Sequence, residues 1–254
     1  MVRHFKRKAL LLFDEHTPFQ NKKLWKNKLK LIRSFTFDKI IIGGDFIDCY
    51  SISRFEKTPH RAEDLNYEIT EAITMLKALR KAAPNAEIIY ISGNHSERLQ
   101  KILDTNMRAF RNLPDLNLKK LLRFDELNIR YHDEYYKLNN KFIVTHGTAC
   151  CKQSSKAELE KWGISGCSGH VHRYNDHKKN YNEKIKAHPL KWYSFGCGAD
   201  LLQLDYAKNM RHNWDNSFGI IEYDKHNFNM TVIDPSKQNG SFYNPLEGKL
   251  YGKP

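Results

Sequence analysis

Short apolar runs that stop abruptly at polar residues recur along the first half of the chain. Residues 9–13, 39–42 and 87–91 are such runs, and glycine, serine or acidic residues follow each of them. This pattern is typical of buried parallel strands whose functional groups lie beyond their carboxyl ends. Between the first two runs, apolar residues recur at helical spacing among lysine and asparagine: Leu24, Trp25, Leu29, Ile32 and Phe35. The pattern predicts a strand–helix–strand unit over residues 9–48.

Further along the chain, helical and strand patterns alternate. A long helix is expected over residues 62–83, because one face is apolar and Pro84 follows its end. Two or three helices are expected over residues 99–125, and a short one over residues 154–162. Strands are expected over residues 129–148, 164–168, 192–195, 217–223 and 230–233, and the last two should pair. The order of elements predicts an α/β start and a β-rich second half.

The length of the chain, 254 residues, is sufficient for one large core. No linker divides it, so residues 1–234 are expected to form one domain. Residues 235–254 hold few aliphatic side chains and are predicted to be a loosely held tail. No stretch has the length of a secretory signal or of a membrane span. Five cysteines without a CxxC pair indicate free, buried thiols and a reducing, cytoplasmic location.

The chain is strongly basic. Its formal net charge is +13, from 42 Lys and Arg against 29 Asp and Glu. Such an excess suggests an anionic partner, for example a nucleic acid. The alternative is a solvated lysine-rich surface, because the basic residues are spread along the sequence instead of gathering in one stripe.

Five of the expected strands end in side chains that can bind a metal ion. One histidine after a strand is weak evidence, whereas the same arrangement after five apolar runs is much stronger. Carboxylate, amide and imidazole groups without thiolate suit Mn²⁺, Fe or Zn²⁺, and seven such ligands are too many for one tetrahedral site. The candidate ligands are Asp14, His16, Asp45, Asn94, His146, His170 and His172.

The motifs D-x-H, G-D-x-x-D, G-N-H, H-G and G-H-x-H, which begin at residues 14, 44, 93, 146 and 169, together resemble the calcineurin-like metallophosphoesterase superfamily. The resemblance covers roughly residues 9–223. It implies an α+β fold in which a two-sheet β sandwich is flanked by helices, with a dinuclear metal site at the strand ends. It also implies that Asp14, His16 and His172 hold one ion, that Asn94, His146 and His170 hold the other, and that Asp45 bridges both. Mn²⁺ is favoured, and Fe, Zn²⁺, Mg²⁺ or Ni²⁺ are alternatives.

The same resemblance implies a reaction. A two-metal centre can generate a bridging hydroxide at neutral pH and can clamp the phosphoryl oxygens. The resemblance makes His95 the general acid that faces the leaving oxygen, with Asp48 as the residue that orients it. A carboxylate on one imidazole nitrogen would fix the tautomer of the ring. The alternative role for Asp48 is to cap the N-terminus of a helix.

Departures from the family pattern bear on the substrate. In the serine/threonine protein phosphatases an arginine that grips phosphate follows the second Asp, but here Cys49 follows it, and Ser96 replaces the usual glutamate after His95. These changes favour phosphodiesters. The segment 48–55 looks like that of phosphoesterases often found in bacteriophages, which are loosely similar to DNA repair exonucleases. The expected function is therefore phosphodiesterase or nuclease. The alternatives are a phosphomonoesterase acting on phosphoproteins or nucleotides, and a non-catalytic scaffold.

The substrate itself would be a nucleic acid or another phosphodiester. Three arginines near the motifs, Arg54, Arg98 and Arg173, are candidates for contacts with its phosphates, and surface ion pairs are the alternative role. Aromatic residues of the tail either stack on bases or pack locally. No membrane partner is expected, and a phage-encoded protein would act in the host cytoplasm.

Overall fold

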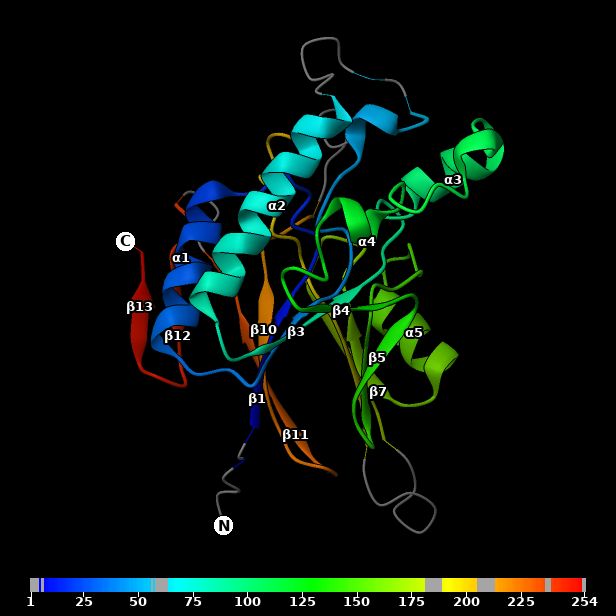
Figure 1. The fold of residues 1–254 in the computed structure, drawn as a ribbon. Helices are drawn as coiled ribbons and strands as arrows, with labels where there is room; N and C mark the ends of the chain where they lie inside the picture. The colour runs from blue at the N-terminus through cyan, green and yellow to red at the C-terminus, as the bar shows by residue number, and fades with distance from the viewer. Residues whose placement is uncertain are drawn as a thin grey trace.

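Two β-sheets lie face to face in the computed structural model, which describes residues 5, 7–55, 57, 64–180, 189–204, 213–235 and 239–252 (Figure 1). In the larger sheet, β1, β2, β3 and β4 are parallel, and β10 and β11 extend it antiparallel beyond β1. The predicted strand–helix–strand unit is confirmed, since Leu10 pairs with Ile40 in a parallel register. The sheet runs in the order β11 (Phe228–Ile233), β10 (Phe218–Tyr223), β1 (Arg7–Leu12), β2 (Lys39–Ile42), β3 (Glu87–Ile91) and β4 (Ile129–His132).

The second sheet has three parallel central strands and two antiparallel edges. Its order is β5 (Tyr135–Asn139), β6 (Phe142–Thr145), β7 (Ser165–Ser168), β9 (Leu190–Ser194) and β8 (Asn175–Lys179). We did not predict β8, because its sequence, Asn-Asp-His-Lys-Lys, has no apolar alternation. A charged strand of this kind suits the edge of a sheet, where lysines discourage pairing with another chain.

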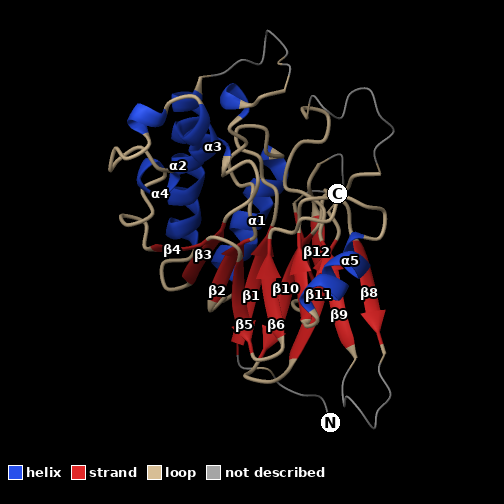
Figure 2. Ribbon diagram, turned by 90° about the vertical axis from the view of Figure 1, so that its right-hand side faces the viewer, coloured by secondary structure: helices blue, strands red, loops and turns tan. Residues whose placement is uncertain are grey.

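The alternation of side chains along the central strands builds two separate cores. Leu10, Ile40 and Ile88 face α1 (Lys22–Ser34) and α2 (Leu65–Ala82), which cover the outer face of the first sheet. Their neighbours in the sequence, such as Leu11 and Ile41, face the second sheet. Helix α5 (Ser154–Trp162) covers the other side of that sheet (Figure 2). The predicted sandwich flanked by helices is confirmed. Residues 62 and 63 of the expected long helix lie outside the described ranges.

Three short helical segments connect β3 to β4, in agreement with the prediction for residues 99–125. They are α3 (Arg98–Thr105), η3 (Arg108–Phe110) and α4 (Leu118–Leu121). A further single turn, η1 (Tyr50–Ile52), follows β2. Figure 1 shows α3 and the chain after it projecting beyond the rest of the molecule at the end where β1, β2 and β3 finish.

The prediction of a loose tail is wrong for residues 239–252. These residues form a hairpin of β12 (Phe242–Asn244) and β13 (Lys249–Tyr251) beside α1. Phe242 and Tyr251 are only 2% and 3% exposed and stack on one another at 5.2 Å, while the Tyr251 hydroxyl lies 2.6 Å from Ser34 Oγ on α1. The scarcity of aliphatic residues was misleading because two aromatic side chains supply the buried area.

The cysteines are free, and all five lie in described parts of the chain. Cys49, Cys167 and Cys197 are buried, as predicted, but Cys150 and Cys151 are exposed. The last two lie in a loop between β6 and α5, where no apolar pattern surrounds them. Within the described ranges, no helix combines the length and the apolar character needed to cross a membrane.

Candidate metal centre

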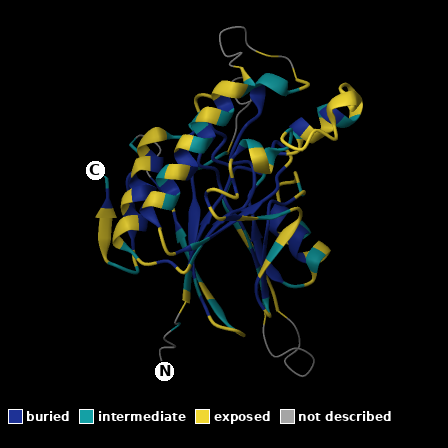
Figure 3. Cartoon of the chain, viewed as in Figure 1, coloured by how far each residue is buried: buried dark blue, intermediate teal, exposed yellow. Residues whose placement is uncertain are grey.

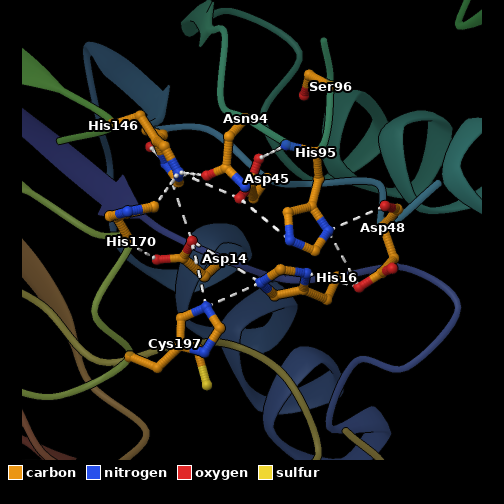
Figure 4. Close-up of polar contacts among 12 residues, drawn as sticks. Asp14, His16, Asp45, Asp48, Asn94, His95, Ser96, His146, His170 and Cys197 are labelled. Carbon is orange, nitrogen blue, oxygen red and sulfur yellow. Dashed lines mark hydrogen bonds and ion pairs between the residues drawn. The ribbon is translucent and has the colours of Figure 1, made fainter. Parts of the chain in front are cut away.

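The seven predicted ligands meet where the two sheets end. Asp14 and His16 follow β1, Asp45 follows β2 and Asn94 follows β3. The second sheet contributes His146 after β6, and His170 and His172 after β7. Figure 4 shows the side chains from the two sheets pointing toward one another. The fold therefore brings into one cluster residues that lie up to 158 positions apart in the sequence, from Asp14 to His172.

One part of the cluster, which we call the buried group, consists of Asp14, His16 and His172. The Nε2 atoms of the two histidines lie 3.0 Å apart, and Asp14 Oδ1 lies 3.9 Å from the first and 3.7 Å from the second. Asp14 Oδ1 is fully buried and has no hydrogen-bond partner among the described residues. A buried oxygen without a partner requires an explanation, and a cation among these three atoms would provide one.

The second part, which we call the open group, consists of Asp45, Asn94, His146 and His170. His146 Nε2 lies at its centre, 3.1 Å from Asp45 Oδ2, 2.9 Å from Asn94 Oδ1 and 3.2 Å from His170 Nδ1. His170 is half-buried and Asn94 is exposed, in contrast to the buried group. These four donor atoms also fit a divalent ion, and the side of Asn94 is open to solvent.

Asp45 is the residue for which the resemblance implied a bridge. Its Oδ1 accepts a hydrogen bond of 2.9 Å from the backbone N–H of His95, and its Oδ2 faces His146. The two groups also approach each other through His146 Nδ1, which lies 3.9 Å from Asp14 Oδ1. The structure thus places Asp45 in the open group, and the bridging role stays a prediction.

The backbone of the cluster is strained. Positive φ angles between 46° and 70° occur at five of the candidate ligands: Asp14, His16, Asp45, His170 and His172. Each such angle in a residue with a side chain costs on the order of 1–3 kcal/mol, and strain of this kind gathers at functional sites. Two motif glycines are required for space as well: a Cβ atom would lie 2.2 Å from Asp45 Oδ1 at Gly93, and 2.2 Å from Asp14 Oδ2 at Gly169.

Comparison with known proteins agrees with this architecture. No protein-family model matches the sequence. The Gene 54 proteins of Mycobacterium phages D29 and L5 are 24% identical over 230 residues and 23% identical over 233 residues, and each match covers 86% of this chain and 89% of the relative. Among solved structures, Vacuolar Protein Sorting 29 from Cryptosporidium parvum matches with a TM-score of 0.50 and 14% identity, over 98% of this chain and 97% of that one. The chain has the calcineurin-like metallophosphoesterase fold.

The electrostatics of this candidate metal centre favour bound cations. Burial by itself would raise the pKa of Asp45, but the neighbouring His146 and His95 hold that pKa well below its usual range. Burial likewise opposes charge on His146, yet the Asp45 carboxylate raises the pKa of His146 to about 9. At neutral pH the carboxylate is therefore ionised and holds a proton on the imidazole. A metal ion would replace that proton, as metal ligands release protons on binding.

Asp48 contacts two histidines. Its Oδ2 lies 2.8 Å from His16 Nδ1 and 3.4 Å from His95 Nδ1, and its backbone oxygen lies 3.0 Å from the same nitrogen of His95. Burial raises the pKa of Asp48, but these two imidazoles lower it more, so the group is anionic. The contact with His16 was not predicted from the sequence. It gives a candidate ligand the outer carboxylate that metal-binding histidines usually have.

The three predicted arginines lie in different surroundings. Arg98 reaches the centre: its Nη1 donates to the backbone oxygen and to Oδ1 of Asp48, at 2.9 and 3.2 Å, and its Nη2 lies 3.1 Å from His95 Nε2. Arg54 is exposed and lies over the ring of Phe55. Arg173 donates to Asn213 Oδ1 and to the backbone oxygen of Cys151. Only Arg98 contacts the predicted catalytic pair.

Several supporting contacts were not predicted from the sequence. Glu15, between two ligands of the buried group, forms a buried ion pair of 2.5 Å with Lys28 of α1. Glu158 of α5 accepts hydrogen bonds from the backbone of the loop after His146. In the same loop, Cys150 Sγ lies 2.9 Å from His170 Nε2. For the contacts of Lys28 and Glu158, the sequence did offer a clue. Each is a charged residue on the buried side of its helix, a position that is unusual for a charged residue without a partner.

Proposed function

We propose that this protein is a divalent-metal-dependent phosphoester hydrolase whose substrate is a phosphodiester, in particular that of a nucleic acid. The observation that carries the proposal is the gathering of seven oxygen and nitrogen ligands into two adjacent groups with His95 beside them. The fold by itself is weaker support for hydrolysis than these side chains, because a solved structure of the same fold is named for vacuolar protein sorting and not for hydrolysis.

The residues present fit two ions. The buried group would hold one and the open group the other, with Mn²⁺ favoured because all donors are oxygen or imidazole nitrogen. Bound ions at such a site supply an activated water and neutralise the charge of the phosphoryl oxygens. Asp45, a member of the open group beside His146, would contribute the negative charge that both ions share.

His95 is the proposed general acid. It is buried, and its Nε2 lies 4.0 Å from Asp45 Oδ2, on the side of the candidate ligands. Burial lowers the pKa of His95, but the charge of Asp45 and the hydrogen bond with Asp48 outweigh burial, so the pKa is raised. A raised pKa increases the share of the protonated imidazole, which is the form that a group must have to protonate a leaving oxygen.

The residue after Asp48 favours a diester substrate over a monoester. Cys49 is fully buried there, so this position offers no cationic clamp for a phosphate dianion. The net charge of +13 supports a polyanionic substrate. Phosphomonoester hydrolysis remains the second candidate because Arg98, beside His95, is placed to contact an additional phosphate oxygen.

The phage relatives support a proposal about where the protein acts. The two similar Gene 54 proteins come from mycobacteriophages. A protein that shares their setting would work in the cytoplasm of an infected cell, where it meets both viral and host nucleic acids.

A substrate comparison tests the proposed function. The protein would be assayed with bis-p-nitrophenyl phosphate, p-nitrophenyl phosphate, and single- and double-stranded DNA, each with Mn²⁺ and with chelator. We expect faster turnover of the diester than of the monoester, cleavage of DNA, and loss of all activity with chelator and in Asp14→Asn. Faster turnover of the monoester would favour the second candidate. Two bound ions without hydrolysis of any substrate would indicate a scaffold.

A further inference from the structure

The segment after His95 carries apolar side chains that the core does not use. Helix α3 buries only Leu99 and Leu103, and η3 buries none of its residues. Figure 3 shows the far end of this segment, after α3, in the colour of exposed residues. At its far end Met107, Phe110 and Leu113 are 44%, 47% and 50% exposed. Large apolar side chains that gather on a projection are commonly part of a binding surface.

The far end of the projection also carries two arginines. Residues 105–113 include Arg108 and Arg111 and no acidic residue. Asp104, at the end of α3, holds both arginines: Arg108 Nε donates to its backbone oxygen at 3.0 Å, and Arg111 Nε lies 3.6 Å from its Oδ1. The two guanidinium groups therefore lie at one place on the surface. Because the ion pair with Asp104 is exposed, it is weak, and a phosphate can compete for these arginines.

The position of the projection relates it to the proposed reaction. Helix α3 begins three residues after His95, and Arg98 in its first turn contacts that histidine. In the proposed function His95 faces the leaving oxygen. The part of the substrate that departs with that oxygen is therefore the part that would extend over α3.

We propose that Met107, Arg108, Phe110, Arg111 and Leu113, called the α3 tip, bind a single-stranded polynucleotide on the leaving-group side of the cleaved bond. This inference rests on the proposed function. The two arginines would contact phosphates and Phe110 would stack on a base, the combination that single-strand binding surfaces use. A protein partner would need the apolar residues but not two adjacent guanidinium groups, so the charge favours a polynucleotide.

The geometry predicts a dependence on substrate length. The eight residues of α3 span about 12 Å at 1.5 Å per residue. At 3.4 Å per nucleotide along a helical strand, roughly four nucleotides beyond the cleaved bond are needed to reach the α3 tip, and fewer if the strand is extended. Substrates with fewer nucleotides beyond the cleaved bond should not reach the α3 tip, and their binding should not depend on its residues.

The experiment compares matched variants in binding and in catalysis. One variant combines Arg108→Gln with Arg111→Gln; a second pair consists of Phe110→Ala and the conservative Phe110→Trp. The control combines Lys178→Gln with Lys225→Gln, which removes two exposed charges near the opposite end of the sheets. Binding of a fluorescent single-stranded 20-mer is followed by anisotropy over a range of salt, and hydrolysis of bis-p-nitrophenyl phosphate is measured on the same samples.

We expect the arginine variant to lower the slope of log affinity against log salt by about 1.4, from two lost phosphate contacts on a single strand. Phe110→Ala should weaken binding roughly 5- to 100-fold, as loss of one stacked base does, and Phe110→Trp should restore it. The control and the hydrolysis of the small diester should remain at wild-type level.

Other outcomes would overturn the proposal. Wild-type DNA affinity and slope in the tip variants, with hydrolysis of the small diester intact, would refute the α3 tip and leave the proposed function standing. Equal losses in the control would assign binding to the general charge of the protein. If the wild type hydrolyses no phosphodiester, the proposed function fails, and the anisotropy data still decide whether the tip binds DNA.

Discussion

The two halves of the candidate metal centre differ in their access to solvent. Each residue of the buried group, Asp14, His16 and His172, has at most 4% of its surface exposed, whereas in the open group His170 is half-buried and Asn94 is exposed. A buried charge that is not paired is energetically costly. An ion in the buried group would therefore be held firmly by protein ligands that solvent does not reach. The open group is the side from which substrate and solvent can enter. The difference suggests a division between anchoring and exchange.

The supports of the two halves differ in the same way. The buried group is fastened by Asp48 and by the Glu15–Lys28 ion pair, both inside the protein. The open group is backed by Glu158 through a loop and by Cys150, which is itself exposed. If the buried group anchors one ion and the open group exchanges the other, a change to a supporting residue should affect the ion of its own group and not the other ion.

The largest effect is expected for Asp45, the residue of the open group that we propose to serve both ions. Asp45→Asn removes the carboxylate charge that both ions would share. Activity should fall by more than the roughly 10- to 100-fold typical of outer supporting residues, and metal analysis should show a loss of both ions. Loss of one ion only would show that Asp45 serves the open group alone.

The next largest effect concerns His95, which belongs to neither half. His95→Ala should reduce cleavage of DNA by about 10² to 10⁴ and affect a nitrophenyl diester much less, because nitrophenolate leaves without a proton. Asp48→Asn should give a milder form of the same defect together with weaker metal binding by the buried group, because Asp48 also contacts His16. Both variants are assayed with metal content measured in parallel. Equal losses on the two substrates with both ions present would remove His95 from the role of acid.

The support of the buried half can be tested through the thermal stability of the protein. Lys28→Met leaves Glu15 buried without its partner, which typically costs about 3–5 kcal/mol. For a chain of this size, that corresponds to a decrease in Tm of roughly 6–20 °C, measured by calorimetry. Lys30→Met, at an exposed position of the same helix, is the control and should change little. A similar Tm for both variants would show that the Glu15–Lys28 pair does not anchor this half.

The smallest effect is expected at the support of the open half. Cys150→Ala removes the contact with His170 Nε2, and because the thiol is exposed, the affinity for one ion should fall by about 10-fold or less. Titration with Mn²⁺ should show the weaker site shifting while the tighter one does not. Cys151→Ala serves as the control at the adjacent exposed thiol. A shift of the tighter site instead would place Cys150 in support of the buried half.

Much of the fold was predictable because its patterns are local. The apolar runs at residues 39–42 and 87–91 match β2 and β3, and α5 has the expected bounds, since burial on one or two faces leaves a periodic trace in the sequence. The hairpin at the end of the chain was missed because two aromatic side chains carry its burial. Strand β8 was missed because it is polar and depends on pairing with β9.

The sequence by itself determined which strand ends carry the candidate ligands, the chemical types of these seven side chains, and the glycines that leave room for the carboxylates. Only the tertiary structure decided how these groups divide, since Asp45 meets His146 and Asp14 meets His172 across two different sheets. It also decided that Asp48 contacts both His16 and His95, and that Arg98 contacts Asp48 and His95. The pattern of residues along one helix or strand shows which of its side chains are buried and where the backbone needs space. The contacts named above depend instead on how the two sheets pack together, and that packing leaves no local pattern in the sequence.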